Sequence, residues 1–290
     1  MTIVDPELAR ILWHRIETVN AVTYFSPECR EGPAALGLKG FWMGYFACRA
    51  APLGPVGPGV VEATFFNFHP DRVRRAIPDA WSIASPDEVL HLRSTAAASA
   101  LRRLLGAEGA EQLASAVTPT LRSVIALANG AGRPLFAANR EVPAPDDPVA
   151  ALWQAATTVR EHRGDSHVAL LTGAVLDGCE VHVLFAAGED APAELYQQSR
   201  GWSEDDWGAA VGHLQGRGLL EADGSLADTG AALRSDIERR TDELAAGPYA
   251  GVDGPEIDRM LDVLGPAAAR IAAAGDIRYP NPMGLPPADT

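Results

Sequence analysis

The residues best suited to bind or transform a small molecule are concentrated between positions 24 and 68. Aromatic residues make up only 7% of the chain. This segment nevertheless contains Tyr24, Phe25, Phe41, Trp42, Tyr45, Phe46, Phe65, Phe66 and Phe68. Polar side chains interrupt the run, and an apolar pocket with a few polar groups is the usual site for a small ligand. The segment therefore predicts a site for a small apolar or aromatic ligand. The simpler alternative is that these residues form an aromatic core of the first domain. The predicted ligand-binding residues are Tyr24, Glu28, Trp42, Tyr45, Arg49, Glu62, Phe66 and Asn67.

Two carboxylates in this segment, Glu28 and Glu62, stand beside apolar residues, where a buried charge requires a partner. Arg49 is the natural partner, and its guanidinium is also suited to clamp a ligand carboxylate through two parallel hydrogen bonds. An enzyme of specialised metabolism is the alternative to a binding protein, with Glu28, Glu62, Tyr24 or His14 supplying acid–base chemistry. The pattern assigns no catalytic residue.

The sequence contains no motif for metal binding, nucleotide binding or thiol chemistry. The 7 histidines match no HExxH spacing, and there is no GxSxG, phosphate loop or dinucleotide glycine motif. Cys29, Cys48 and Cys179 form no CxxC pair, so neither a zinc site nor a disulfide framework is predicted. No apolar run reaches the roughly 20 residues that span a bilayer. We expect no cofactor, no metal, no membrane contact and a reducing cytoplasm.

Residues 202–246 have the pattern of a winged helix-turn-helix unit. An amphipathic helix begins after Ser203, a good N-terminal cap, and its end carries glycines that let the chain turn away. Asp223-Gly224 has the composition of a tight hairpin turn between two short strands. A long helix covers 230–245. The sequence therefore predicts a mainly α protein with short β-hairpin wings.

A weak internal repeat suggests that this unit occurs twice. Leu12-Trp13 is echoed by Leu152-Trp153, and a second pair recurs at a nearly equal offset. Between the two copies lies a stretch rich in proline and glycine, which is typical of a linker. We predict two winged-helix-like units: an aromatic-rich helical domain with a degenerate winged helix over 1–130, a linker over 131–148, and a winged-helix domain over 149–290.

Candidates for DNA contact come from a basic helix in the first half and from the segment between Asp205 and Gly218. They are Arg72, Arg74, Arg75, His213, Gln215 and Arg217. Such cations and amides reach phosphates and base edges. The predicted wing is acidic, however, and the net charge of −14 opposes binding to phosphate. The motif thus predicts DNA as a partner, whereas the acidic charge disfavours it. The sequence also leaves a homodimer open.

The 202–246 segment resembles the end of the MarR-like winged-helix families, in which L-x-x-x-G-L-[LI] precedes the wing and L-T-x-x-G opens the next helix. The matching positions are Leu214, Gly218, Leu219, Leu220, Leu226, Asp228, Thr229 and Gly230. The whole chain resembles the actinobacterial SalK-type helix-turn-helix family, through blocks at 24–28, 40–54, 65–68 and 78–81. That resemblance implies a fold more than a function. It fails at Asn20, where the family carries His, so no catalytic base is assigned there.

Composition, motifs and resemblance together predict a MarR-like transcriptional regulator that binds a small, largely apolar molecule between its two halves. The enzyme described above is the alternative. A scaffold or partner-binding protein without a ligand is the third interpretation.

Overall fold

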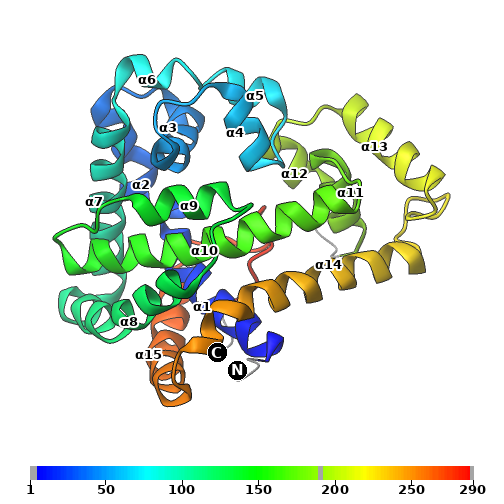
Figure 1. The fold of residues 1–290 in the computed structure, drawn as a ribbon. Helices are drawn as coiled ribbons and strands as arrows, with labels where there is room; N and C mark the ends of the chain where they lie inside the picture. The colour runs from blue at the N-terminus through cyan, green and yellow to red at the C-terminus, as the bar shows by residue number, and fades with distance from the viewer. Residues whose placement is uncertain (1–4, 189–191, 288–290) are drawn as a thin grey trace.

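The computed structural model describes residues 5–188 and 192–287, and this part of the chain consists of helices joined by short turns (Figure 1). The long helices are α1 (Pro6–Phe25), α7 (Pro86–Leu105), α8 (Ala107–Leu127), α10 (Pro148–Gly173), α14 (Asp228–Ala246) and α15 (Gly254–Ala273). The shorter helices are α2 (Pro27–Glu31), α3 (Gly40–Ala50), α4 (Pro58–Phe65), α5 (Pro70–Arg74), α6 (Ala80–Ile83), α9 (Pro134–Glu141), α11 (Gly178–Gly188), α12 (Ala193–Arg200) and α13 (Glu204–Gly216). Short 3-10 segments are η1 (Gly32–Leu36), η2 (Ala51–Leu53) and η3 (Gly247–Gly251).

Local capping chemistry sets where several helices begin. The Asp147 carboxylate accepts hydrogen bonds from the first free backbone N–H groups of α10, those of Val149 and Ala150. Ser85 and Ser203 each take part in a reciprocal capping box with the acidic residue three positions later. The cap predicted at Ser203 is therefore present, and α13 begins at the next residue.

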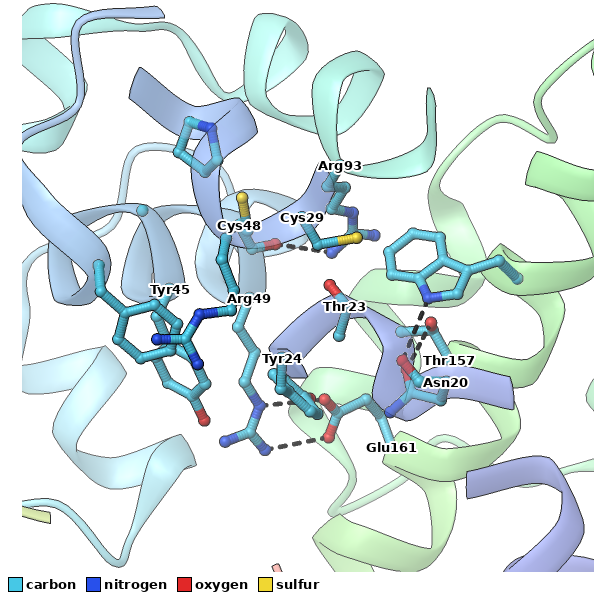
Figure 2. Close-up of a pocket in the computed structure, with 15 residues that line it drawn as sticks. Asn20, Thr23, Tyr24, Cys29, Tyr45, Cys48, Arg49, Arg93, Thr157 and Glu161 are labelled. Atoms are coloured by element: carbon cyan, nitrogen blue, oxygen red, sulfur yellow. Dashed lines mark hydrogen bonds and ion pairs between the residues drawn. The ribbon is translucent and has the colours of Figure 1, made fainter. Parts of the chain in front are cut away.

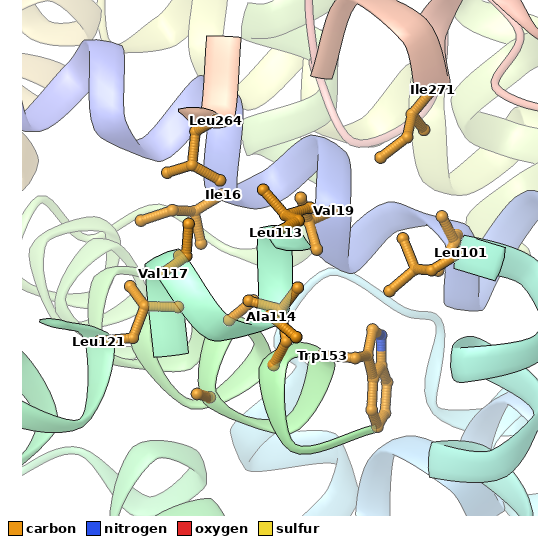
Figure 3. Packing of buried hydrophobic residues seen from close by; sticks show 14 of the residues in the cluster. Ile16, Val19, Leu101, Leu113, Ala114, Val117, Leu121, Trp153, Leu264 and Ile271 are labelled. Carbon is orange, nitrogen blue, oxygen red and sulfur yellow. The ribbon is translucent and has the colours of Figure 1, made fainter. Parts of the chain in front are cut away.

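One apolar core holds the long helices together (Figure 3). It is formed by α1, α7, α8, α10 and α15, and Trp153 of α10 lies in it with only 1% of its surface exposed. Helix α1 packs against α10, α14 and α15, while α10 packs against α7, α8 and α9. Because α10 is covered on nearly every side, its sequence has no clear apolar stripe.

Two smaller apolar clusters lie beside this core. The first cluster contains the aromatic residues Trp42, Tyr45 and Phe46 of α3, together with Phe65 and Phe68. They pack with apolar residues of α5 and of the start of α7. The second cluster gathers α11, α13 and the start of α14 around Leu214, which is fully buried. The stretch 131–148 contains α9, which begins at Pro134 and packs against α10 with Phe136 fully buried.

The predicted β-hairpin wings are wrong, although the mainly α prediction is confirmed. Asp223-Gly224 does form a turn, in which Gly224 has a positive φ of 87° and the Asp223 carboxylate accepts from the Ser225 backbone. Pairing on either side amounts to one isolated antiparallel bridge between Leu220 and Leu226. Helix α14 begins at Asp228, so the returning arm is too short to extend the pairing. Residues 5–188 and 192–287 contain no β-strand.

Over the same ranges, no single helix is long and apolar enough to cross a membrane; α10 and α11 meet that test only together, across a bend of 98°.

Candidate functional site

A cavity of about 610 Å³ lies among the helices. Residues of α1, α3, α10, α11, α12 and α14 line it, together with the C-terminal segment 282–286. Its walls therefore come from both halves of the chain. The volume falls within the range of about 300–1,000 Å³ that is usual for small-molecule sites.

The aromatic segment singled out in the sequence supplies one wall of this cavity. Tyr24, Trp42, Tyr45, Arg49 and Asn67 all line it. The Tyr45 ring lies 5.6 Å from the Tyr24 ring and 5.6 Å from the Trp42 ring, measured between centroids. Burial raises the pKa of Tyr24 to about 12, so its hydroxyl stays protonated and can donate a hydrogen bond.

The other three predicted ligand-binding residues lie outside this cavity. Glu28 forms a bidentate ion pair with Arg103 at 2.6 and 3.0 Å, and this hydrogen bonding lowers its pKa. Glu62 pairs with Arg74 at 2.9 Å. Phe66 packs against the apolar cluster of α11 and α13. Two of the acid–base candidates of the enzyme alternative are thus held by arginines away from the cavity.

Arg49 is paired with Glu161 of α10, a residue that the sequence did not single out (Figure 2). The two side chains form parallel hydrogen bonds of 3.1 and 3.2 Å, and Arg160 adds a third contact to Glu161 at 2.8 Å. Arg160 also reaches Glu17 of α1 at 3.2 Å. Burial would raise the pKa of Glu161, but Arg160 and Arg49 outweigh it and lower the pKa to about 2. This network ties α3 to α10 and α1 beside the cavity.

A smaller pocket of about 30 Å³ adjoins the cavity at this network (Figure 2). Asn20, Thr157 and Glu161 line it with polar atoms, and Tyr24 and Arg49 face both spaces. The Thr157 hydroxyl donates to the Asn20 side chain at 2.8 Å. A space of about 30 Å³ holds roughly two or three water molecules, because a water needs roughly 10–15 Å³. Asn20 therefore serves as a hydrogen-bonding group between α1 and α10.

A second polar group, also missed in the sequence, lies where α11 and α12 meet the cavity. It contains His182 and Arg200, and the His182 ring stacks on Tyr196 with centroids 4.8 Å apart. Burial, followed by the nearby Arg200 charge, lowers the pKa of His182 well below its usual range, so this imidazole is neutral. The sequence shows His182 only as a single histidine in an apolar segment, and that pattern does not predict that it lies beside Tyr196 and Arg200.

The three predicted DNA-binding arginines of the first half lie on and beside α5. Arg72 is half-buried, with its guanidinium 4.5 Å from the centre of the Trp42 ring. Arg74 is exposed and paired with Glu62, and Arg75 is also exposed. Arg74 and Arg75 are therefore the two of this group that solvent or a partner can reach.

The candidates of the second half are engaged in contacts within the protein. His213 lies 2.5 Å from the Glu180 carboxylate. The Gln215 amide donates to the backbone carbonyls of residues 221 and 222, and the Arg217 guanidinium donates to those of residues 174 and 175. Asp205 is exposed at the start of α13. The surface of α13 thus offers phosphate little positive charge.

Metal binding has no support in the described parts of the chain, where no three His, Cys, Asp or Glu side chains come close enough to hold an ion.

The chain matches a helix-turn-helix family over residues 9–278, and it belongs to that family. Proteins with this motif are typically DNA-binding regulators. Neither a curated protein nor a solved structure matches the chain.

Proposed function

We propose that the protein is a transcriptional regulator of MarR-like, SalK-type ancestry whose activity responds to a small, largely apolar molecule in the cavity of about 610 Å³. The observation that carries this proposal is the cavity of about 610 Å³ in a helix-turn-helix family member, with walls contributed by both halves of the chain. A ligand there touches the long helices α1 and α10 and the short helices α3 and α12 at once. It can therefore shift the balance between arrangements of these helices.

The order of helices supports a second part of the proposal, that the chain is a tandem duplication with units over 1–130 and 149–290. Each unit begins with a long helix, α1 or α10, continues through short helices, and ends with two long ones. Packing is reciprocal, because α1 packs against α14 of the other unit while α10 packs against α7. Two-fold related subunits exchange contacts in this way. One chain would then correspond to a dimer of simpler regulators.

Charge favours the first unit over the second as the DNA-contacting part. Arg75 is exposed on the first unit beside Arg74, which is also exposed although it pairs with Glu62. The polar residues at the end of α13 are bound to neighbouring backbone and side chains. A basic patch of two arginines on a protein of net charge −14 predicts weak, salt-sensitive binding.

The ligand proposal is tested with phenylnaphthylamine, a neutral aromatic probe that fluoresces in apolar surroundings. Val168 of α10 lines the cavity, while the adjacent Ala169 is exposed. We expect saturable binding to the wild type, and Val168→Trp should weaken it by about tenfold, or roughly 1.4 kcal/mol. The matched Ala169→Trp variant should bind as the wild type does. Equal affinities for all three proteins would refute the cavity as the binding site.

The DNA proposal is tested by fluorescence anisotropy with genomic fragments over a range of salt concentrations. Replacing Arg74 and Arg75 together by Gln should weaken binding and reduce the slope of log affinity against log salt by about 2. The matched control replaces exposed Arg122 and Arg270, which lie on α8 and α15. An unchanged slope would remove the α5 patch, and no binding at low salt would remove DNA as a partner.

A further inference from the structure

We infer that the ligand of the cavity carries a negatively charged group and that Arg200 receives it. This inference rests on the proposed ligand-binding function and adds the chemical class of the ligand, an aromatic or apolar molecule bearing a carboxylate or a similar anionic group.

Arg200 is a cation at the cavity wall whose charge no acid of the described residues neutralises. Its Nη2 atom donates to the backbone carbonyl of Pro282 at 2.5 Å, and its Nε atom is buried without a hydrogen-bond partner. No carboxylate in residues 5–188 or 192–287 lies within ion-pair distance of it. Burial lowers its pKa, as expected for a guanidinium that is removed from water without an opposite charge beside it.

Three other arginines of the cavity wall, which are half-buried or buried, differ from Arg200 in this respect. Arg49 and Arg160 share Glu161, with contacts of 3.1 and 2.8 Å. Arg163 pairs with Asp242 at 2.9 Å. A buried charge normally has an opposite charge beside it because its desolvation is costly. The guanidinium of Arg200 therefore marks the place where a ligand anion supplies the missing partner.

The surroundings of Arg200 form a built subsite. The His182 side chain is 4% exposed, and its Nε2 atom has no hydrogen-bond partner. Because this imidazole is neutral, one of its ring nitrogens carries a proton that it can donate to an anion. The Arg200 guanidinium lies 4.7 Å from the centre of the Phe68 ring, which fixes its plane and leaves apolar surface beside it for the body of a ligand.

The C-terminal segment completes this subsite from the other side. Pro282, Met283 and Gly284 line the cavity. The Asn281 side chain holds the segment in place, because its oxygen accepts from the Leu285 backbone at 3.2 Å and its nitrogen donates to the Leu285 carbonyl at 2.9 Å. The anion site is thus bounded by α11 and α12 on one side and by the chain after α15 on the other.

The test compares two probes of nearly identical shape. Phenylnaphthylamine is neutral, whereas anilinonaphthalene sulfonate adds one anionic group to the same aromatic frame. We expect the wild type to bind the sulfonate more tightly. Arg200→Gln should weaken sulfonate binding by about 10- to 100-fold, the range for a hydrogen bond to a charged group. Its affinity for phenylnaphthylamine should stay within about twofold, and Arg200→Lys should keep part of the preference for the anion. Arg122→Gln, an exposed change of equal charge, should alter neither affinity.

The outcomes separate the two proposals. If neither probe binds the wild type, the ligand-binding function itself is refuted. If phenylnaphthylamine binds and the sulfonate binds no more tightly, the anion subsite is refuted while the cavity stands. If Arg200→Gln leaves the sulfonate affinity unchanged, Arg200 is not the anion's partner. The wild-type comparison decides the question even if Arg200→Gln melts early, and thermal melting of each variant identifies that case.

Discussion

Replacing Glu161 by Gln should destabilise the protein strongly, because it leaves two half-buried arginines without their shared acid. The Glu161 side chain is only 2% exposed, and it contacts Arg49 and Arg160 together. Glutamine keeps the size and one hydrogen-bonding oxygen but removes the charge. The perturbation therefore isolates the electrostatic part of the network that ties α3 to α10.

The magnitude can be worked from the pKa of Glu161, which falls from 4.5 to about 2 on folding. At about 1.36 kcal/mol for each pH unit, the ionised form contributes roughly 3 kcal/mol to folding. Removal of one partner from a buried ion pair typically costs about 3–5 kcal/mol, which agrees. For a chain of this size, about 3 kcal/mol corresponds to a loss of roughly 6–12 °C in Tm.

Thermal melting at several pH values measures this effect and its sign. Because the folded pKa lies below the unfolded one, the stabilisation is fully present above pH 4.5 and is lost as pH falls towards about 2. The wild type should therefore exceed Glu161→Gln most at pH 7, and the difference should shrink below pH 4.5.

Glu141→Gln is the matched control. The Glu141 side chain is 78% exposed and pairs with Arg140 at 3.5 Å, so its replacement should cost less than about 0.5 kcal/mol. A Tm for Glu161→Gln as close to wild type as that of this control, at pH 7, would refute the account of the network.

Three other changes probe the burial of polar and aromatic groups and the cap of α13. Burial raises the pKa of Asp165 to about 6, so the folded state loses stability as pH rises from 3.8 to 6. Asp165→Asn should remove this pH-dependent loss of stability; a difference between the variant and the wild type in urea unfolding that does not change with pH would contradict the prediction. Trp153→Ala should cost about 3–5 kcal/mol in urea unfolding because Trp153 lies in the main core, and a cost below about 1 kcal/mol would count against that packing. Ser203→Ala breaks the capping box with Asp206 and should cost about 1 kcal/mol, seen as roughly fivefold faster hydrogen exchange in the first turn of α13; unchanged exchange there would show that the cap does not hold that turn.

Local chemistry made much of the helical architecture predictable. The Ser203 cap and the turn at Asp223-Gly224 depend on neighbouring residues, and both occur where the sequence places them. The length of a strand depends on where the next element of the chain begins. Helix α14 begins at Asp228, and this early start leaves a bridge where a hairpin was predicted.

The candidate site was predictable only where it depends on composition. The aromatic segment pointed to Tyr24, Trp42 and Tyr45, which line the cavity. Glu161 could not be found in this way, because α10 is covered on most sides and its apolar residues follow no helical period. Arg200 is the last residue of a short helix, and it contacts Pro282, which lies far away in the sequence. Its surroundings therefore could not be predicted from the neighbouring residues.

A crystal structure with phenylnaphthylamine tests the central claim most directly, that the space between the two halves is a ligand site. The account predicts density for the rings within the cavity, against Tyr45 and Phe68 and between α1, α10 and α12. Rings bound only on the outer surface, with water alone filling the cavity, would contradict it.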